Sequence, residues 1–221
     1  MTRVTSPVRH AITAAASGLA WTAAASLALR ALPGQARLER TNFHGRTVSL
    51  RGGIATAIGA TAAAGRTGAL ARRLPANPAP RPVLAAVIAA SAGGTAGLID
   101  DLDAGAHDGD APAKGLSGHL GALAKGRVTT GALKIAIIGS GALVSGVLLA
   151  RHRALTAPAP RPARLPAFAA DAVVSTVAIG AWANVHNLLD LRPGRALKAS
   201  ALISIPLLLP GIPRPVKLGL A

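Results

Sequence analysis

Two adjacent carboxylates stand at the end of an apolar run, where they could hold a cation. Asp100 and Asp101, followed by Asp103, come directly after the uncharged stretch 83–99. If that stretch is a helix, its dipole disfavours anions at this end, and the neighbouring carboxylates also repel each other. A bound hard cation such as Mg²⁺ would relieve both effects, because it takes carboxylate oxygens as ligands. The alternative is that these acids only begin a solvated loop.

A second polar group lies near the end of the apolar run 172–189. Asn184, Asn187 and Asp190 recur at every third residue, so on a helix they form one polar stripe. Amides within a membrane helix are costly and usually face the interior of a bundle or a water-filled cavity. The stripe therefore indicates a binding site, and the alternative is hydrogen bonding between helices.

The segment between these two groups is basic and rich in glycine. Lys114 and His119 belong to the sequence Lys-Gly-Leu-Ser-Gly-His, and Arg127 follows in the stretch 125–131. Lysine, arginine and backbone amides at glycines are groups that hold phosphates. The spacing is not that of a P-loop, because no Gly-Lys-Ser or Gly-Lys-Thr occurs. A basic loop at a membrane surface is the alternative.

Several other chemistries are excluded by residue type or by distribution. The chain contains no cysteine, so it has neither disulfides nor a cysteine nucleophile, and its six histidines do not pair at zinc-ligand spacing. The net charge is +16, but the basic residues are scattered through loops and aromatic residues make up only 2% of the chain. We therefore expect no nucleic-acid binding, which needs clustered charge or stacking platforms. Contact with anionic membrane lipid explains the charge more simply.

The elements that carry these residues are predicted to be membrane helices. Hydrophobic residues make up 51% of the chain and charged residues 14%, and small residues are abundant. Small residues favour close helix packing in lipid rather than an aqueous core. Six uncharged, mainly apolar runs occur, at 11–29, 53–65, 83–99, 135–150, 172–189 and 199–213.

These runs predict an all-α, polytopic transmembrane bundle of about five to six spans, forming a single integral membrane domain over residues 1–221. A span needs roughly 20 residues. The run 53–65 is the least secure, because it reaches that length only by continuing to Ala71. The last run is interrupted by prolines, which predicts a shorter, broken or re-entrant helix. For the first run, a cleaved secretory signal peptide is an alternative.

The acidic residues are distributed unequally between the two membrane faces. If all six runs cross, the loops on the two faces carry equal numbers of basic residues, so the positive-inside rule gives no orientation. By the same parity, every acid except Asp171 falls on one face. The carboxylates after run 83–99 and Asp190 are therefore expected at the same end of the bundle.

Taken in order, four segments resemble the polyprenyl-phosphate N-acetylhexosamine-1-phosphate transferases (glycosyltransferase family 4), which include the phospho-N-acetylmuramoyl-pentapeptide transferase of peptidoglycan synthesis. The resemblance covers about residues 30–200. The matching segments are the basic loop ending in Gly52-Gly53, Gly97-Leu98-Ile99-Asp100-Asp101 for the family's Gly-x-x-Asp-Asp, Lys114-Gly115-Leu116 for its Lys-Gly-Leu, and Asn184-Val185-His186-Asn187-Leu188-Leu189-Asp190 for its Asn-x-x-Asn-Leu-x-Asp.

The resemblance implies a multi-pass protein of the bacterial cytoplasmic membrane that acts in cell-envelope synthesis. Polyprenyl phosphate would attack the sugar-linked phosphate of a UDP-linked N-acetyl amino sugar and release UMP, with Mg²⁺ as cofactor. By position, Asp100 and Asp101 would be catalytic and metal-binding, and Asp190 catalytic. Substrate binding would fall to the remaining matched residues and their basic neighbours, namely Lys114, His119, Arg127, Asn184 and Asn187.

This chain also departs from the family pattern. Pro193 stands where the family has a second aspartate, and neither a Gly-Asp-x-Gly-Ser loop nor any acid follows Asp190. The chain is therefore expected to be a C-terminally truncated member. An alternative function is a non-catalytic relic or a lipid-phosphate-binding membrane subunit. A partner chain that completes the site, or a homo-oligomer, is a further expectation.

The site hypothesis makes geometric predictions. Asp100 or Asp101 should approach Asn187 or Asp190, which requires the third and fifth runs to be neighbours at these ends. A helix that separates the two acidic ends would defeat the site hypothesis. Lys114 or Arg127 should lean over the same cavity. If the amides only join helices, the amides would instead be satisfied by adjacent groups, and the two adjacent carboxylates would point into solvent.

Overall fold

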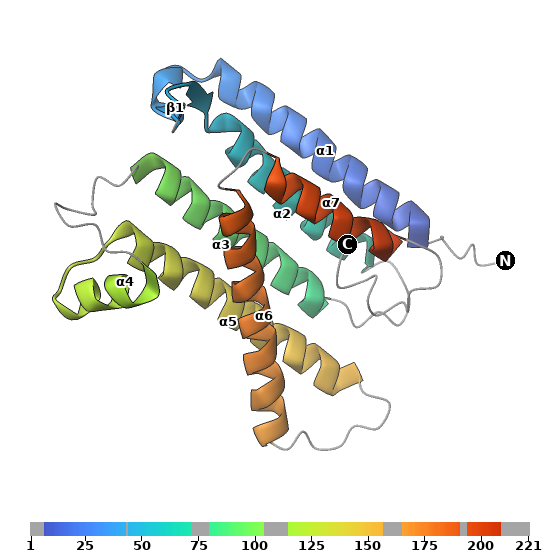
Figure 1. Cartoon of the computed structure of the whole chain (residues 1–221). Helices are drawn as coiled ribbons and strands as arrows, with labels where there is room; N and C mark the ends of the chain where they lie inside the picture. The colour runs from blue at the N-terminus through green and yellow to red at the C-terminus, as the bar shows by residue number, and fades with distance from the viewer. Residues whose placement is uncertain are drawn as a thin grey trace.

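The computed structural model describes residues 7–42, 44–71, 80–103, 115–156, 165–190 and 194–208. These residues form seven α-helices, a 3₁₀ turn and one short hairpin (Figure 1). The elements are α1 (Pro7–Ala31), the 3₁₀ turn (Gln35–Leu38), β1 (Glu39–Thr41), β2 (Thr47–Ser49), α2 (Arg51–Ala71), α3 (Pro80–Asp103), α4 (Gly115–Ala124), α5 (Thr130–Thr156), α6 (Leu165–Leu189) and α7 (Arg195–Leu208).

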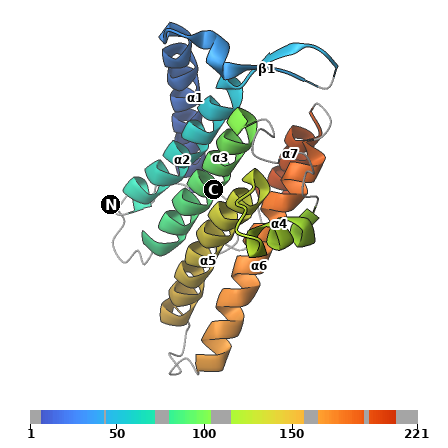
Figure 2. The same cartoon turned by 90° about the vertical axis from the view of Figure 1, so that its left-hand side faces the viewer.

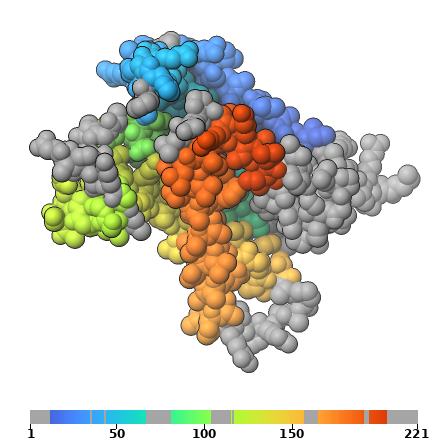
Figure 3. Space-filling view, in the orientation of Figure 1, coloured from blue at the N-terminus to red at the C-terminus, as the bar shows by residue number. Residues whose placement is uncertain are grey.

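The long helices pack in chain order, each antiparallel to the one before it. α1 packs on α2, α2 on α3, α3 on α5, and α5 on α6. They lie side by side in Figure 2. The short helix α4 protrudes beside the start of α5, and α7 lies at the end of α6, so that α6 and α7 form a ridge on the face seen in Figure 3. The all-α prediction is thereby confirmed.

Four of the described helices are long and apolar enough to cross a membrane. They cover Ile12–Ala31, Arg81–Asp103, Thr130–Thr156 and Leu165–Leu189. Their outer surfaces carry large exposed apolar side chains, such as Leu19, which is 73% exposed. Such surfaces suit lipid rather than water. The fold is thus that of a multi-pass membrane protein with four candidate spans, fewer than the five to six expected.

Small residues bring the helices into close contact at every crossing. A Cβ on Gly59 of α2 would lie 1.9 Å from the Thr22 hydroxyl of α1, and one on Gly141 of α5 would lie 2.4 Å from Ala92 of α3. A side chain on Gly146 would likewise meet Thr176 of α6. These glycines therefore allow the backbones to approach, as the composition predicts.

The contacts between α3 and α5 keep one antiparallel register along their whole length. At one end, the buried Ser145 hydroxyl donates to the Ala85 carbonyl at 2.9 Å. Gly141 faces Ala92 in the middle, and Thr130 donates to Asp103 at the other end. The contacts move back along α5 as they move forward along α3, so the two helix ends are fixed relative to each other.

The contacts between α5 and α6 keep a second register of the same kind. At the far end, Arg153 makes two bonds to the Asp171 carboxylate, at 2.9 and 2.7 Å. Gly146 faces Thr176 further along. The register places the start of α5 beside the last turn of α6, and Asp171 lies at the opposite end of the bundle from Asp100.

Two local elements differ from the sequence expectations. The basic loop before Gly52 forms a two-stranded antiparallel hairpin, in which Arg40 pairs with Val48. Its turn is held by the Asn42 side chain, which accepts the backbone amides of His44 and Arg46 at 3.0 Å. Such short polar turns leave no hydrophobic periodicity in a sequence. The segment after Lys114 likewise forms the helix α4 rather than a loop.

Candidate functional site

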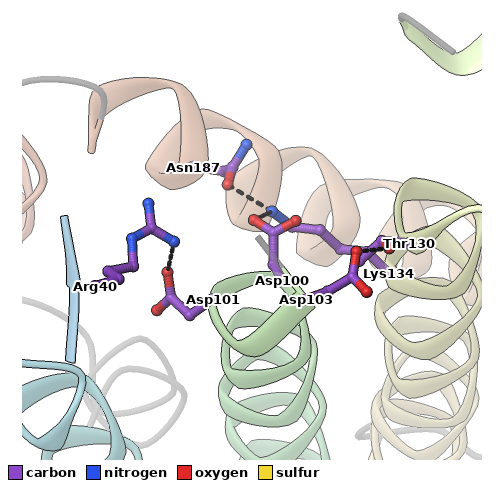
Figure 4. Close-up of polar contacts among 7 residues, drawn as sticks. All are labelled: Arg40, Asp100, Asp101, Asp103, Thr130, Lys134 and Asn187. Carbon is purple, nitrogen blue, oxygen red and sulfur yellow. Dashed lines mark hydrogen bonds and ion pairs between the residues drawn. The ribbon is translucent and has the colours of Figure 1, made fainter. Parts of the chain in front are cut away.

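The centre of the candidate site is the ammonium group of Lys134, in the second turn of α5. Its Nζ donates to Oδ2 of Asp100 at 2.9 Å and to Oδ1 of Asn187 at 2.9 Å (Figure 4). The carboxylate and the amide therefore lie within twice that distance of each other. They come from α3 and α6, so one cation joins the Asp-Asp motif to the polar stripe.

Asp101 points to the other side of α3, toward the hairpin. Its Oδ1 accepts a 2.7 Å bond from Nη1 of Arg40 in β1 (Figure 4). The two side chains are 43% and 42% exposed, so solvent weakens this ion pair. Arg40 and Lys134 nevertheless supply one positive charge to each acid at a helix end whose dipole disfavours anions.

The start of α5 is built to hold this cluster in place. The buried Thr129 caps the helix, because its hydroxyl accepts the Ala132 amide at 3.1 Å. The next residue, Thr130, donates its hydroxyl to the Asp103 carboxylate. The cap therefore fixes the first turn of α5, and the Thr130–Asp103 contact ties that turn to the last turn of α3, one turn away from Lys134.

His119 supports the same helix start from α4. Its Nδ1 lies 2.9 Å from the Thr129 hydroxyl, and its ring lies over Gly131, where an added Cβ would be 2.2 Å from the ring. Gly126, with a φ of +75°, ends α4 and turns the chain toward α5. His119 thus packs against backbone here, and its expected role in substrate binding stays a prediction.

The other predicted site residues are less closely engaged. Asn184 and Asp190 have exposed side chains that bond to no other residue in the described ranges, although both lie at the same end of the bundle as Asp100. The side chain of Arg127 is exposed and makes no ion pair with a described residue. Lys114 lies outside the described residues.

One geometric expectation is wrong, and it counts against the site hypothesis as first stated. The third and fifth apolar runs, now α3 and α6, were expected to be direct neighbours, but α5 packs between them. The side chains at their ends meet only because Lys134 reaches both. Asn187 is satisfied by this contact, as expected for an amide joining helices, whereas Asp100 and Asp101 are paired rather than left in solvent.

Sequence reasoning did not find Lys134 or Arg40 as site residues. Lys134 begins an apolar run, where a lysine usually extends toward the membrane surface. The sequence feature that could have identified Lys134 is its position near the start of a predicted helix, at the membrane face where the helices carrying Asp100 and Asp190 end. Arg40 was one of several basic residues in its loop, and only the hairpin register selects it.

The donor set can be tested against Mg²⁺, the cofactor that the resemblance implies. No three His, Asp or Glu side chains gather as a metal cluster within the described ranges. Mg²⁺ commonly takes only one or two protein carboxylates together with waters and substrate phosphates. The described residues engage one oxygen each of Asp100 and Asp101, and both side chains are more than 40% exposed. These carboxylates therefore fit a substrate-bridged ion, not a closed protein cage.

No family model matches this chain, and no curated protein or solved structure is significantly similar to it. The arrangement of the site therefore stands on its own geometry. It gathers three acids, a cation and an amide from α3, α5 and α6, with a basic hairpin beside them.

Proposed function

We propose that this chain is a phosphoglycosyl transferase-like protein of the bacterial cytoplasmic membrane. It would move the phosphate-linked N-acetyl amino sugar of a UDP-sugar onto polyprenyl phosphate, for cell-envelope synthesis. The observation that carries the proposal is that Asp100 and Asn187, from two separate motifs, share the Lys134 ammonium.

In the proposed reaction, an oxygen of the lipid phosphate attacks the sugar-bearing phosphorus. A new P–O–P bond forms to the lipid, the bond to the nucleotide breaks, and UMP leaves with the electron pair. Phosphoryl transfer depends on positioning and charge neutralisation rather than on covalent help from the protein. Lys134 and Arg40 can each exchange a carboxylate for a phosphate oxygen, because both phosphates and carboxylates accept from such cations.

Asp100 and Asp101 would hold Mg²⁺ through their carboxylates. When bound, the ion supplies positive charge to the phosphates. Asn184, Asn187 and Asp190 form the proposed nucleotide side, and Lys114, His119 and Arg127 the proposed substrate-phosphate side. Of these, Asn187 is supported by its contact with Lys134.

The finer topology also belongs to the proposal. α2 packs along both α1 and α3 over its 21 residues, so we propose that it crosses the membrane with them as a fifth span. α7, with 14 residues, is proposed as the shorter sixth element. We also propose that the protein acts together with a second copy or a partner chain.

The test is release of UMP by membranes that contain the protein. These are incubated with undecaprenyl phosphate, Mg²⁺ and either UDP-N-acetylglucosamine or the muramoyl-pentapeptide nucleotide. Asp100→Asn and Asp101→Asn should each abolish release, whereas Asp171→Asn, at the opposite end of the bundle, should retain it. Release that is unchanged by both substitutions would remove the chemistry from these residues.

A second candidate function is a non-catalytic membrane protein that binds a lipid phosphate without turnover. It is favoured by a specific observation: each acid of the Asp100-Asp101 pair already has a basic partner. This reading predicts no UMP under any condition, but retained binding of undecaprenyl phosphate that weakens in Arg40→Gln and Lys134→Gln. Binding without turnover would select it over the transferase.

A further inference from the structure

An open groove of about 460 Å³ runs between α2 and α3, closed on one side by Trp21 of α1. Its walls are mainly apolar and include Ile58 of α2 and Leu98 of α3. Along α2 it extends from Ile54 to Ala62, which is a little over two helical turns. The groove lies on helices that the site does not use, apart from the end of α3.

The groove leads to the basic hairpin end of the bundle. On α3, Asp101 follows Leu98 by three residues and so continues the same face. On α2, Arg51 precedes Ile54 by three residues in the same way. Arg40, bonded to Asp101, stands at the same mouth. The apolar groove thus ends near Arg40 and Arg51.

The mouth carries an excess of positive charge. Residues 37–51 contain four arginines and a single acid, Glu39. Arg51 lies 3.8 Å from that acid, and Arg40 bonds to Asp101, so both acids of the mouth are paired. Basic residues at a membrane surface attract anionic headgroups.

From these observations we infer that the groove is a binding site for an anionic phospholipid. One acyl chain occupies the groove, and the phosphate lies between Arg51 and Arg40. The mainly apolar walls suit an acyl chain, and the arginines at the mouth suit an anionic headgroup. The site shares Arg40 with the proposed transfer of sugar phosphate, but Arg51 and the apolar groove have no part in that proposal.

The experiment uses the two tryptophans of the chain, Trp21 in the groove and Trp182 on α6. In the variant Trp182→Phe only Trp21 fluoresces, and in Trp21→Phe only Trp182 does, which provides a matched control outside the groove. Each purified variant is placed in phosphatidylcholine vesicles that contain a small, equal fraction of acyl-brominated phosphatidylglycerol or acyl-brominated phosphatidylcholine. Bromine quenches a tryptophan that it touches.

We expect brominated phosphatidylglycerol to quench Trp21 several-fold more than brominated phosphatidylcholine, and both lipids to quench Trp182 equally. Arg51→Gln should lower the preference at Trp21 roughly fivefold, as expected for one basic residue near the surface, while Arg51→Lys should retain it. Thr95→Phe, which fills the groove from α3, should reduce quenching of Trp21, and Gly93→Phe, which faces open space on the same helix, should not.

Two results would overturn the inference. Equal quenching of Trp21 by both lipids would mean ordinary boundary lipid without headgroup selection. Protection of Trp21 from both lipids, with Trp182 still quenched, would mean that protein covers the groove. Neither readout requires turnover. Lipid selectivity without UMP release would support this inference and not the proposed function, and UMP release without lipid selectivity would do the reverse.

Discussion

Lys134 is the residue on which the candidate site depends most. Its side chain is 19% exposed, against 48% for Asp100, so it is the more buried partner of the pair. It satisfies an acid and an amide from helices that α5 holds apart. Removing the charge therefore leaves two polar groups without a partner in the described structure, and also leaves Asp100 at a helix end that disfavours anions.

The first prediction measures this coupling. Lys134→Met and Asp100→Asn, alone and together, should give an interaction free energy of about 0.5–1 kcal/mol in thermal unfolding in detergent. Lys134→Arg should retain most of the stability because it keeps the charge. Lys125→Met removes a lysine that is exposed and is the matched control. Strict additivity of Lys134→Met and Asp100→Asn would mean that the observed bond contributes nothing.

The second prediction concerns the His119 ring over Gly131. Gly131→Ala should destabilise the protein by about 1–3 kcal/mol, because the new methyl group meets the ring at an overpacked contact. Alanine otherwise favours a helix over glycine by about 1 kcal/mol. In a His119→Ala background the same substitution should therefore become stabilising. If Gly131→Ala stabilises both backgrounds, the ring does not pack there.

At the scale of elements, glycine contacts position the helices that carry the site. The third prediction compares two glycines of α5 that are two residues apart. Gly141→Leu should lower folded yield or stability by more than about 2 kcal/mol, because its side chain enters Ala92 of α3. Gly139→Leu should be tolerated, because nothing lies within 4 Å of its Cβ position. Equal effects at the two positions would argue against the α3–α5 register.

The helices were predictable from sequence for a physical reason. Long uncharged runs such as 83–99 and 172–189 cannot be anything but helices in a bilayer, and the parity of the runs places Asp100 and Asn187 at one end. The partners within that end were not predictable, because they depend on helix order in space. A lysine that starts one run reaches the ends of two others only when its helix packs between them.

Short polar elements were missed for a different reason. The β1–β2 hairpin is held by Asn42 and three backbone pairs, and α4 has only ten residues, so neither has the periodic pattern that identifies an element. Arg40 and His119 are placed by these two elements. Of the two site residues that escaped sequence reasoning, Arg40 belongs to structure too short to leave a sequence signal, whereas Lys134 lies on a long helix and depends on helix order.

At the scale of the whole molecule, the chain should present the hairpin and the ends of α3 and α6 on one side of the membrane. The fourth prediction uses the absence of native cysteine. Single cysteines at Thr47 and Asp190 should react with a membrane-impermeant reagent from one side of intact vesicles. Cysteines at Thr156 and Leu165 should react from the other. Labelling of Thr47 and Asp190 from opposite sides would contradict the antiparallel order of the helices.

Because α5 contacts α3 at several points along its length, the number of residues between these contacts matters as much for the site as the contact residues themselves. Lys134, Gly141 and Ser145 lie nearly in phase on one helix, and each touches α3. Inserting one residue between Lys134 and Gly141 would rotate the lysine by about 100° and displace it by about 1.5 Å relative to the buried contacts. Inserting four would nearly restore the angle but move the ammonium about 6 Å along the axis. The six residues 135–140 have no proposed chemical role, but their number sets the distance and the angle between Lys134 and Gly141. Insertions or deletions there should therefore be tolerated less than substitutions.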